Sequence, residues 1–246
     1  MMSAADHPRD QAVQSMFDRI AGRYDLLNRV ISFRLDTRWR DRAIRTLVTA
    51  ENPLIVDLGT GTGDLAFNAA KIAGAEARIV GLDFSMQMIR LAQHKRSRAR
   101  HGASTTFVQA SALQAPMKGG IFDGAMTAFV LRNVSDLPRF FAEAYRLLKP
   151  GGRFVSLDMF PPSSRWFSSL YAIYFYRLMP FIGGLLSNDL KAYQYLSDSV
   201  RQFHPPETLA RMIAQAGFVD VKIQKFMHGA VCMHVATKSP VSTETT

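Results

Sequence analysis

Short apolar runs alternate with stretches of helical composition along most of the chain. The runs end at glycine, proline or polar residues, which is typical of buried strands. We predict strands at residues 54–58, 77–82, 105–109, 122–129 and 153–157. We predict helices at residues 66–73, from Ser85 towards Arg100, and from Ser135 or Asp136 through Leu148. This alternation predicts a parallel, doubly wound sheet with right-handed crossovers.

The last part of the chain ends in two strands that follow a helix. Residues 206–216 read as a helix, and residues 218–226 and 229–237 read as strands. The gap between these strands is too short for a helix, so they must pair antiparallel. The sequence therefore predicts an α/β fold whose seven-stranded sheet is mostly parallel, with one reversed strand near its edge.

Two further segments lie outside this alternation. Residues 11–48 read as helical with apolar side chains on one face, and we expect them to cover the carboxyl edge of the sheet. Residues 166–187 are almost wholly apolar and long enough to cross a bilayer, but Arg177 at their middle and Pro180 favour a surface or lid helix. The predicted organisation is a helical cap over residues 1–50, an α/β domain over 51–238 with a helical insert at about 161–200, and a disordered tail over 239–246.

Composition and charge limit the class of protein. The chain has 246 residues, of which 48% are hydrophobic and 20% charged, so it can bury a core without disulfides or a structural metal. Cys232 is its single cysteine and residues 1–11 hold no apolar signal-peptide core, so we expect a cytoplasmic protein. The net charge of +10 favours an acidic partner such as nucleic acid or an anionic membrane surface. Because the basic residues are spread widely, charge alone does not indicate specific nucleic-acid binding.

The strongest local motif joins the first predicted strand to the helix that follows it. Residues 55–64 read IVDLGTGTGD, a strand that ends in a glycine-rich turn. Glycines there let the backbone approach a ligand closely, and Asp83 ends the next strand, where a carboxylate can accept both hydroxyls of a ribose. This pattern fits NAD, FAD or S-adenosylmethionine.

Asp64 discriminates between these three ligands. A dinucleotide fingerprint has glycine at this position, and its pyrophosphate sits on the helix amino terminus, where a carboxylate would repel it. S-adenosylmethionine has no phosphate but carries an ammonium and a sulfonium, which Asp57 and Asp64 tolerate or favour. We therefore expect S-adenosylmethionine, with residues 109–112 near its adenine.

Three sequence blocks resemble a known family. Residues 17–28 read FDRIAGRYDLLN, residues 131–134 read LRNV and residues 148–152 read LKPGG. Over about residues 13–237 the chain resembles the class I methyltransferases and, among them, the ubiquinone and menaquinone biosynthesis C-methyltransferases. Three positions depart from the family's frequent pattern: Thr60 stands where the turn often has a glycine, Ala128 stands in place of a serine and Val130 in place of a glycine.

The motif and the resemblance together imply a donor site and an acceptor site. The donor is S-adenosylmethionine and the acceptor a polyprenyl quinol, with demethylmenaquinol favoured over 2-methoxy-6-polyprenyl-1,4-benzoquinol. The expected donor-site residues are Asp57, Gly59, Gly61, Thr62, Gly63, Asp83, Ser111 and Ala112. The expected acceptor-site residues are Arg132, Asn133 and Tyr24. No cluster of His, Cys and Asp at ligand spacing points to a catalytic metal.

The expected chemistry assigns a role to the residues after the fourth strand. Methylation of a ring carbon needs electron density there, which deprotonation of the neighbouring hydroxyl supplies, and Arg132 and Asn133 would stabilise the developing oxyanion. A guanidinium stays protonated in proteins, so we expect Arg132 to be an electrostatic stabiliser rather than a base. Other interpretations stay open, namely that Arg132 pairs with a surface carboxylate, Asn133 ends a strand and Tyr24 packs in a helix.

The apolar insert and the basic charge leave several interpretations open. The insert can line a channel for a polyprenyl tail, which predicts visits of a cytoplasmic enzyme to the inner face of the membrane, but a lid or a dimer face explains it as well. An RNA or small-phenol methyltransferase is the nearest rival, although residues 127–131 lack the Asn/Asp-Pro-Pro-aromatic signature of adenine methylation. A non-catalytic quinone- or lipid-binding scaffold is a rival from another class, and the intact donor turn argues against it.

Overall fold

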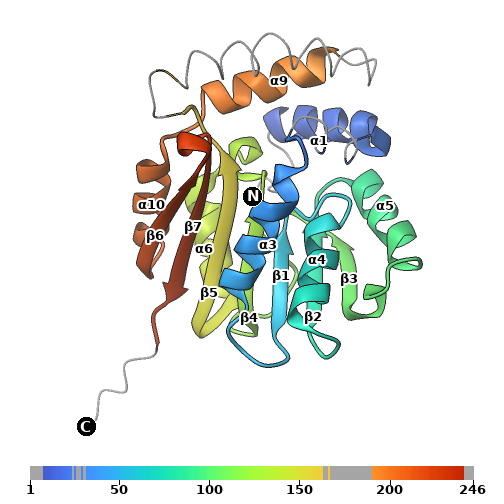
Figure 1. Ribbon diagram of the computed structural model, residues 1–246, viewed down its shortest axis with the longest axis vertical. Coiled ribbons are helices and arrows are strands. Elements are labelled where there is room, and N and C mark those ends of the chain that lie inside the picture. The colour runs from blue at the N-terminus through green and yellow to red at the C-terminus, as the bar shows by residue number, and fades with distance from the viewer. Residues whose placement is uncertain are drawn as a thin grey trace.

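The computed structural model describes residues 8–23, 25, 29, 32–162, 166 and 190–240. A seven-stranded sheet in the order β3-β2-β1-β4-β5-β7-β6 forms its centre (Figure 1). The strands are β1 (Leu54–Leu58), β2 (Arg78–Asp83), β3 (Thr105–Gln109), β4 (Phe122–Ala128), β5 (Leu148–Met159), β6 (Phe218–Phe226) and β7 (Val231–Lys238). Neighbouring strands are parallel except that β7 runs antiparallel to β5 and β6. The predicted α/β fold with one reversed strand near the edge is confirmed.

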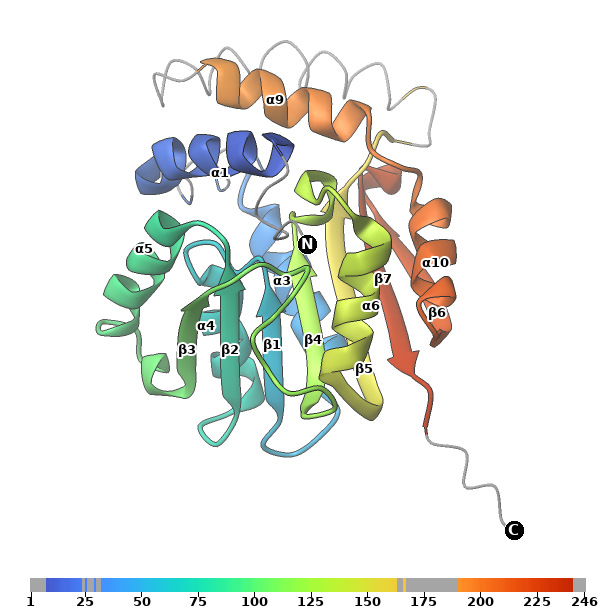
Figure 2. The same cartoon turned by 180° about the vertical axis from the view of Figure 1, so that it is seen from behind.

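Helices cover both faces of the sheet (Figures 1 and 2). One face carries α3 (Leu35–Leu47), α4 (Asp64–Ala73) and α5 (Met86–Arg96), and the other carries α6 (Leu137–Leu147) and α10 (Pro206–Gln215). Along β1, Ile55 packs in the first layer and Val56 in the second, as the alternation of a strand requires. Burial on both faces explains why β1 reads as an apolar run, whereas β6 at the sheet edge alternates apolar and polar residues.

Two helices start at capping side chains. The Ser85 hydroxyl accepts a hydrogen bond from the Met88 amide at 3.1 Å at the start of α5. The Asp136 carboxylate accepts one from the Arg139 amide at 2.9 Å at the start of α6. Both starts agree with the sequence prediction.

The carboxyl edge of the sheet lies beneath two further helices. α1 (Pro8–Ile20) crosses this edge, and α9 (Leu190–Arg201) lies above α1 (Figures 1 and 2). The short helices are η1 (Ala21–Arg23), η2 (Gly102–Ser104), η3 (Leu131–Asn133) and η5 (Met227–Gly229). α1 thus lies where the cap was expected, whereas α3, from the same predicted segment, packs on a face of the sheet because Ile44 and Leu47 are buried there.

Two element boundaries differ from the prediction by four residues or more. α5 ends at Arg96 rather than Arg100, because the chain turns there and the Gly102 amide bonds the Ala99 carbonyl at 3.0 Å. β5 starts at Leu148 rather than Arg153, because Leu148 pairs with Phe122 ahead of an irregularity in the β4–β5 register.

None of the helices in the described part of the chain is long and apolar enough to cross a membrane. The apolar residues 166–187 of the insert lie outside the described residues, apart from Trp166. The same holds for Tyr24 and for the tail beyond residue 240.

Candidate active site

The glycine-rich turn after β1 is tied to the neighbouring strands. The amides of Gly59 and Thr60 both bond the Leu82 carbonyl, at 2.9 and 2.7 Å. Gly59 has a φ of 78°, and a Cβ built on it would meet the Val130 side chain at 2.6 Å. A glycine is therefore required at position 59 for both its backbone conformation and its close approach to the turn after β4.

Asp83 stands at the carboxyl end of β2 and faces this turn. Its Oδ2 accepts a hydrogen bond from the Gly61 amide at 2.8 Å, and its Oδ1 accepts one from the Ser85 amide at 2.9 Å. Burial raises the pKa of Asp83 to about 6, although these two amide bonds oppose the shift. The carboxylate is thus fixed in place by the turn that it faces.

A cavity of about 330 Å³ opens at this edge of the sheet. Its volume is within the range of small-ligand sites. Its lining comes from α1, from α5, from the ends of β2 and β3, and from the segments that follow β1, β2, β3 and β4: Asp10, Gln14, Phe17, Gly59, Gly61, Leu82, Asp83, Phe84, Met88, Gln109, Ala110, Ser111, Ala112, Leu113, Phe129, Val130, Asn133, Val134 and Ser135. The cavity lies at the carboxyl ends of the strands, where open α/β sheets bind ligands.

A smaller acidic pocket of about 20 Å³ adjoins the other side of the glycine-rich turn. Its lining includes four carboxylates, those of Asp25, Asp36, Asp57 and Asp64, with Arg40 as the basic residue. The Thr60 hydroxyl donates to Asp57 Oδ2 at 2.7 Å, while the buried Asp57 Oδ1 has no hydrogen-bond partner within the described part. Burial raises the pKa of Asp57 to about 7. This pocket suits a small cationic group.

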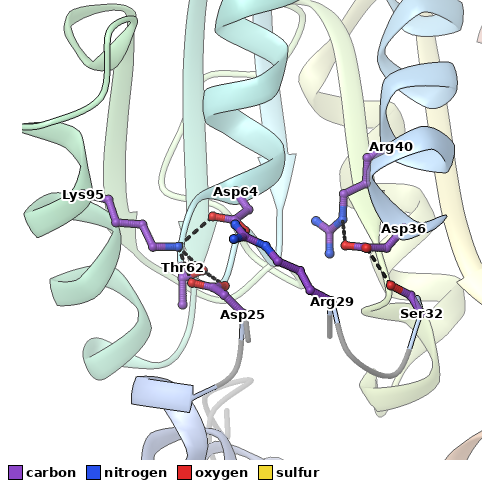
Figure 3. Close-up of polar contacts among 8 residues, drawn as sticks. All are labelled: Asp25, Arg29, Ser32, Asp36, Arg40, Thr62, Asp64 and Lys95. Atoms are coloured by element: carbon purple, nitrogen blue, oxygen red, sulfur yellow. Dashed lines mark hydrogen bonds and ion pairs between the residues drawn. The ribbon is translucent and has the colours of Figure 1, made fainter. Parts of the chain in front are cut away.

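A network centred on Lys95 joins α5, α4 and the segment between α1 and α3 (Figure 3). The Lys95 Nζ donates to Asp25 Oδ2 at 2.5 Å, to Asp64 Oδ1 at 2.7 Å and to Thr62 Oγ1 at 2.9 Å. Thr62 in turn donates to Asp25 Oδ1 at 2.6 Å, and Arg29 pairs with Asp64 at 3.4 Å. The network fixes the Thr62 side chain on the turn and compensates the charge of the nearby carboxylates.

The chain after β4 turns sharply at Phe129 before η3. Phe129 has a φ of 63°, a left-handed conformation that is uncommon for an aromatic residue, and the Arg40 guanidinium lies 5.1 Å from the centre of its ring. η3 then carries Arg132 and Asn133 side by side. Asn133 lines the cavity, and its Oδ1 accepts a hydrogen bond from the Tyr195 hydroxyl of α9 at 3.2 Å.

Arg132 lies in a buried ion pair. Its Nη1 donates to Asp158 Oδ1 of β5 at 2.7 Å, and both side chains are almost fully buried. Arg132 Nε and Asp158 Oδ2 are buried without a hydrogen-bond partner among the described residues. Arg132 lines neither the cavity nor the acidic pocket, and its partner is a buried rather than a surface carboxylate.

The predicted donor-site residues surround the turn, and Gly59 and Gly61 line both the large cavity and the acidic pocket. Those that line the large cavity are Gly59, Gly61, Asp83, Ser111 and Ala112. Asp57 and Thr62 line the acidic pocket, and Gly63 is the residue from which α4 begins. Their roles as ligand contacts stay predictions.

Some polar residues around the cavity were not predicted from the sequence. On α1, the Gln14 side chain donates to the Phe84 carbonyl at 3.0 Å, and Asp10 accepts from the Ser135 hydroxyl at 2.8 Å. These side chains come from a helix whose sequence shows only one apolar face, so no local motif marks them. No motif in the sequence marks Lys95 as a site residue either.

The fold and the site together define a class of protein. A SAM-dependent methyltransferase from Thermotoga maritima aligns with a TM-score of 0.65 at 20% identity, over 92% of this chain and 99% of that one. A phosphoethanolamine N-methyltransferase from Haemonchus contortus, solved with S-adenosyl-L-methionine, aligns with a TM-score of 0.59 at 16% identity, over 81% and 52%. The fold is that of the class I methyltransferases.

Sequence comparison gives the family. The ubiE/COQ5 methyltransferase family model matches residues 5–238. A demethylmenaquinone methyltransferase from Thermus thermophilus is 44% identical over 91% of this chain and 100% of its own length. A ubiquinone/menaquinone biosynthesis C-methyltransferase from Citrifermentans bemidjiense is 38% identical over 94% and 97%. The chain belongs to the ubiE/COQ5 methyltransferase family and is an S-adenosylmethionine-dependent methyltransferase.

Proposed function

We propose that the enzyme transfers the methyl group of S-adenosylmethionine to a ring carbon of a polyprenyl quinol. Demethylmenaquinol is the favoured acceptor, and 2-methoxy-6-polyprenyl-1,4-benzoquinol is the next candidate. The names of the similar enzymes from T. thermophilus and C. bemidjiense support this choice. The observation that carries the proposal is one cavity that joins Asp83 and the glycine-rich turn to Asn133 after β4.

The residues of the turn fit the donor. Asp83 would accept hydrogen bonds from the ribose hydroxyls, and Ser111 and Ala112 would lie beside the adenine. The unpartnered Asp57 Oδ1 and the acidic pocket around it suit the ammonium of the methionine moiety. When bound, S-adenosylmethionine supplies an electrophilic methyl group on a sulfonium.

The acceptor side needs a group that stabilises negative charge on the quinol oxygen. Asn133 lines the cavity and can donate a hydrogen bond from Nδ2 to that oxygen. Arg132 is adjacent in η3, but it lines neither the cavity nor the acidic pocket and its charge is balanced by Asp158. We therefore assign the direct contact to Asn133 and an electrostatic role to Arg132, with Tyr24 as a further polar partner.

A methyl-transfer assay with labelled S-adenosylmethionine tests this function. Reduced demethylmenaquinone and a reduced methoxy-polyprenyl-benzoquinone are compared, each with its oxidised form as the control. Labelled product from a reduced acceptor, and none from its oxidised form, is expected because only the quinol can supply electron density to the ring carbon. Donor binding without product from either quinol would contradict the proposal and favour an RNA or small-phenol acceptor or a scaffold.

We also propose that the enzyme visits an anionic membrane surface to reach its acceptor. A polyprenyl quinol resides in the bilayer, and the net charge of +10 favours anionic headgroups. Trp166 exposes 64% of its surface at the start of the apolar insert, and tryptophan is enriched at membrane interfaces.

A further inference from the structure

Asn133 lies between the cavity and α9, the helix that follows the apolar residues 166–187. It is the last residue of η3, which packs against α9 and is placed by the left-handed turn at Phe129. Its side chain lines the cavity on one side and contacts Tyr195 of α9 on the other. The Tyr195 side chain is half-buried, so solvent competes only in part for its hydroxyl.

The two hydrogen bonds of the Asn133 side chain fix which way its carboxamide points. The Tyr195 hydroxyl donates to Oδ1 at 3.2 Å, while Nδ2 makes a long hydrogen bond of 3.5 Å to the Phe129 carbonyl. A carboxamide has one acceptor oxygen and two N–H donors. With Oδ1 engaged by a phenol, the group offers N–H rather than an oxygen lone pair to a ligand.

We propose that Tyr195 is a positioning residue that orients Asn133 for catalysis. This proposal rests on the proposed function, in which Asn133 donates a hydrogen bond to the quinol oxygen. The Tyr195 hydroxyl holds Oδ1 and so keeps Nδ2 available to that oxygen as negative charge develops on it. A carboxamide turned the other way would present its oxygen to the same charge and repel it.

The position of Tyr195 joins α9 to the edge of the cavity. It belongs to α9, which follows the apolar residues 166–187, whereas Asn133 follows β4 on the edge of the donor cavity. Movement of α9 away from η3 would break the contact. The orientation of Asn133 therefore depends on the placement of α9 against η3.

The test is a double-mutant cycle on the full-length enzyme with labelled S-adenosylmethionine and reduced demethylmenaquinone. Tyr195→Phe keeps the ring and removes the hydroxyl, and we expect kcat to fall about tenfold with an unchanged Kd for S-adenosylmethionine. In an Asn133→Ala background the same substitution should cause no further loss. An unchanged kcat in Tyr195→Phe, or losses that multiply in the double variant, would overturn the proposal.

Two further measurements test the positioning role of Tyr195 independently of folding and of the identity of the acceptor. Tyr145→Phe makes the same chemical change at a half-buried tyrosine that packs on Phe218, so its kcat should equal that of the wild type. The Asn133 side-chain amide signals in ¹⁵N spectra, assigned with Asn133→Ala, should shift in Tyr195→Phe and not in Tyr145→Phe. These signals need no acceptor, so they decide the orientation even if neither quinol is turned over. Unchanged Asn133 side-chain signals in Tyr195→Phe would contradict the proposed orientation of the carboxamide.

Discussion

At the scale of single residues, the ionisation of Asp83 should control donor binding. Its pKa is raised to about 6 by burial, so the carboxyl is largely protonated at pH 5 and ionised at pH 7. Ribose hydroxyls donate best to the ionised form. The affinity for S-adenosylmethionine should therefore increase as the pH rises through 6, and Asp83→Asn should bind at least about tenfold more weakly and lose most of this pH dependence. Equilibrium titrations between pH 5 and 8 measure both effects.

The Asp83 carboxyl should stabilise the folded protein more at low pH, which is the opposite of its effect on donor binding. Because its folded pKa lies above the ordinary value of 3.8, its contribution to stability is fully present below about pH 4 and is lost as the pH rises through 6. Asp83→Asn should flatten that part of the stability profile. Asp220→Asn is the matched control, since Asp220 is exposed on β6. An Asp83→Asn variant that binds the donor as tightly as the control would refute the assignment of Asp83.

Residues of the donor turn could be predicted because the chemistry is local. The turn follows a strand and Asp83 ends the next one, so the parallel topology alone brings them together. Lys95 and Tyr195 could not be predicted as site residues. They lie on helices, and their partners Asp25, Thr62 and Asn133 are brought near by tertiary packing rather than by any spacing in the sequence.

At the scale of elements, the Arg132–Asp158 ion pair joins η3 to β5, and removal of one partner alone should destabilise the folded protein. Arg132→Ala leaves a buried, uncompensated carboxylate, so we expect a loss of about 3 to 5 kcal/mol in the free energy of unfolding. The double variant Arg132→Met/Asp158→Leu replaces both charges with apolar side chains and should recover most of that loss. Denaturant unfolding of the single and double variants measures this coupling.

The double variant also separates a structural role of Arg132 from an electrostatic one. If Arg132 stabilises the developing oxyanion, the refolded double variant should bind S-adenosylmethionine normally and still show a reduced kcat. A double variant with wild-type kcat would contradict the electrostatic role and leave only the structural pair.

Elements with strong local signals were predicted most closely. The bounds predicted for β1, β3 and β6 agree with those observed, since a turn-forming residue, Pro53, Ser104 or Gly217, directly precedes each of them. The early start of β5 could not be predicted, because Pro150 and Gly151 read as a loop and only pairing with β4 extends the strand through them. The packing of α3 on a sheet face likewise depends on tertiary contacts with α4 and β5.

At the scale of the whole molecule, the positive charge should bring the enzyme to anionic membranes. In liposome flotation we expect enrichment with anionic vesicles that carry demethylmenaquinol, less with neutral vesicles, and a decrease as salt screens the charges. All vesicles carry demethylmenaquinol, so the differences between anionic, neutral and high-salt conditions measure the electrostatic contribution to membrane binding. Absence of enrichment with the quinol-loaded anionic vesicles would contradict the proposed membrane visits.

The topology of the whole molecule could be predicted because two rules suffice for it. Helical crossovers make neighbouring strands parallel, and the short link between β6 and β7 forces one reversal. The cavity volume and the roof that α1 forms over it required the structure. They depend on how a helix from the start of the chain packs across an edge made of four separate strands.

The most direct measurement locates the transferred methyl group. The enzyme is incubated with S-adenosylmethionine labelled with ¹³C in its methyl group and with reduced demethylmenaquinone, and the product is examined by ¹³C NMR. A C-methyltransferase of quinols should place the label on a ring carbon and leave both ring hydroxyls unmethylated. A labelled methoxy group, or a donor that binds without any labelled quinone, would contradict the proposed function.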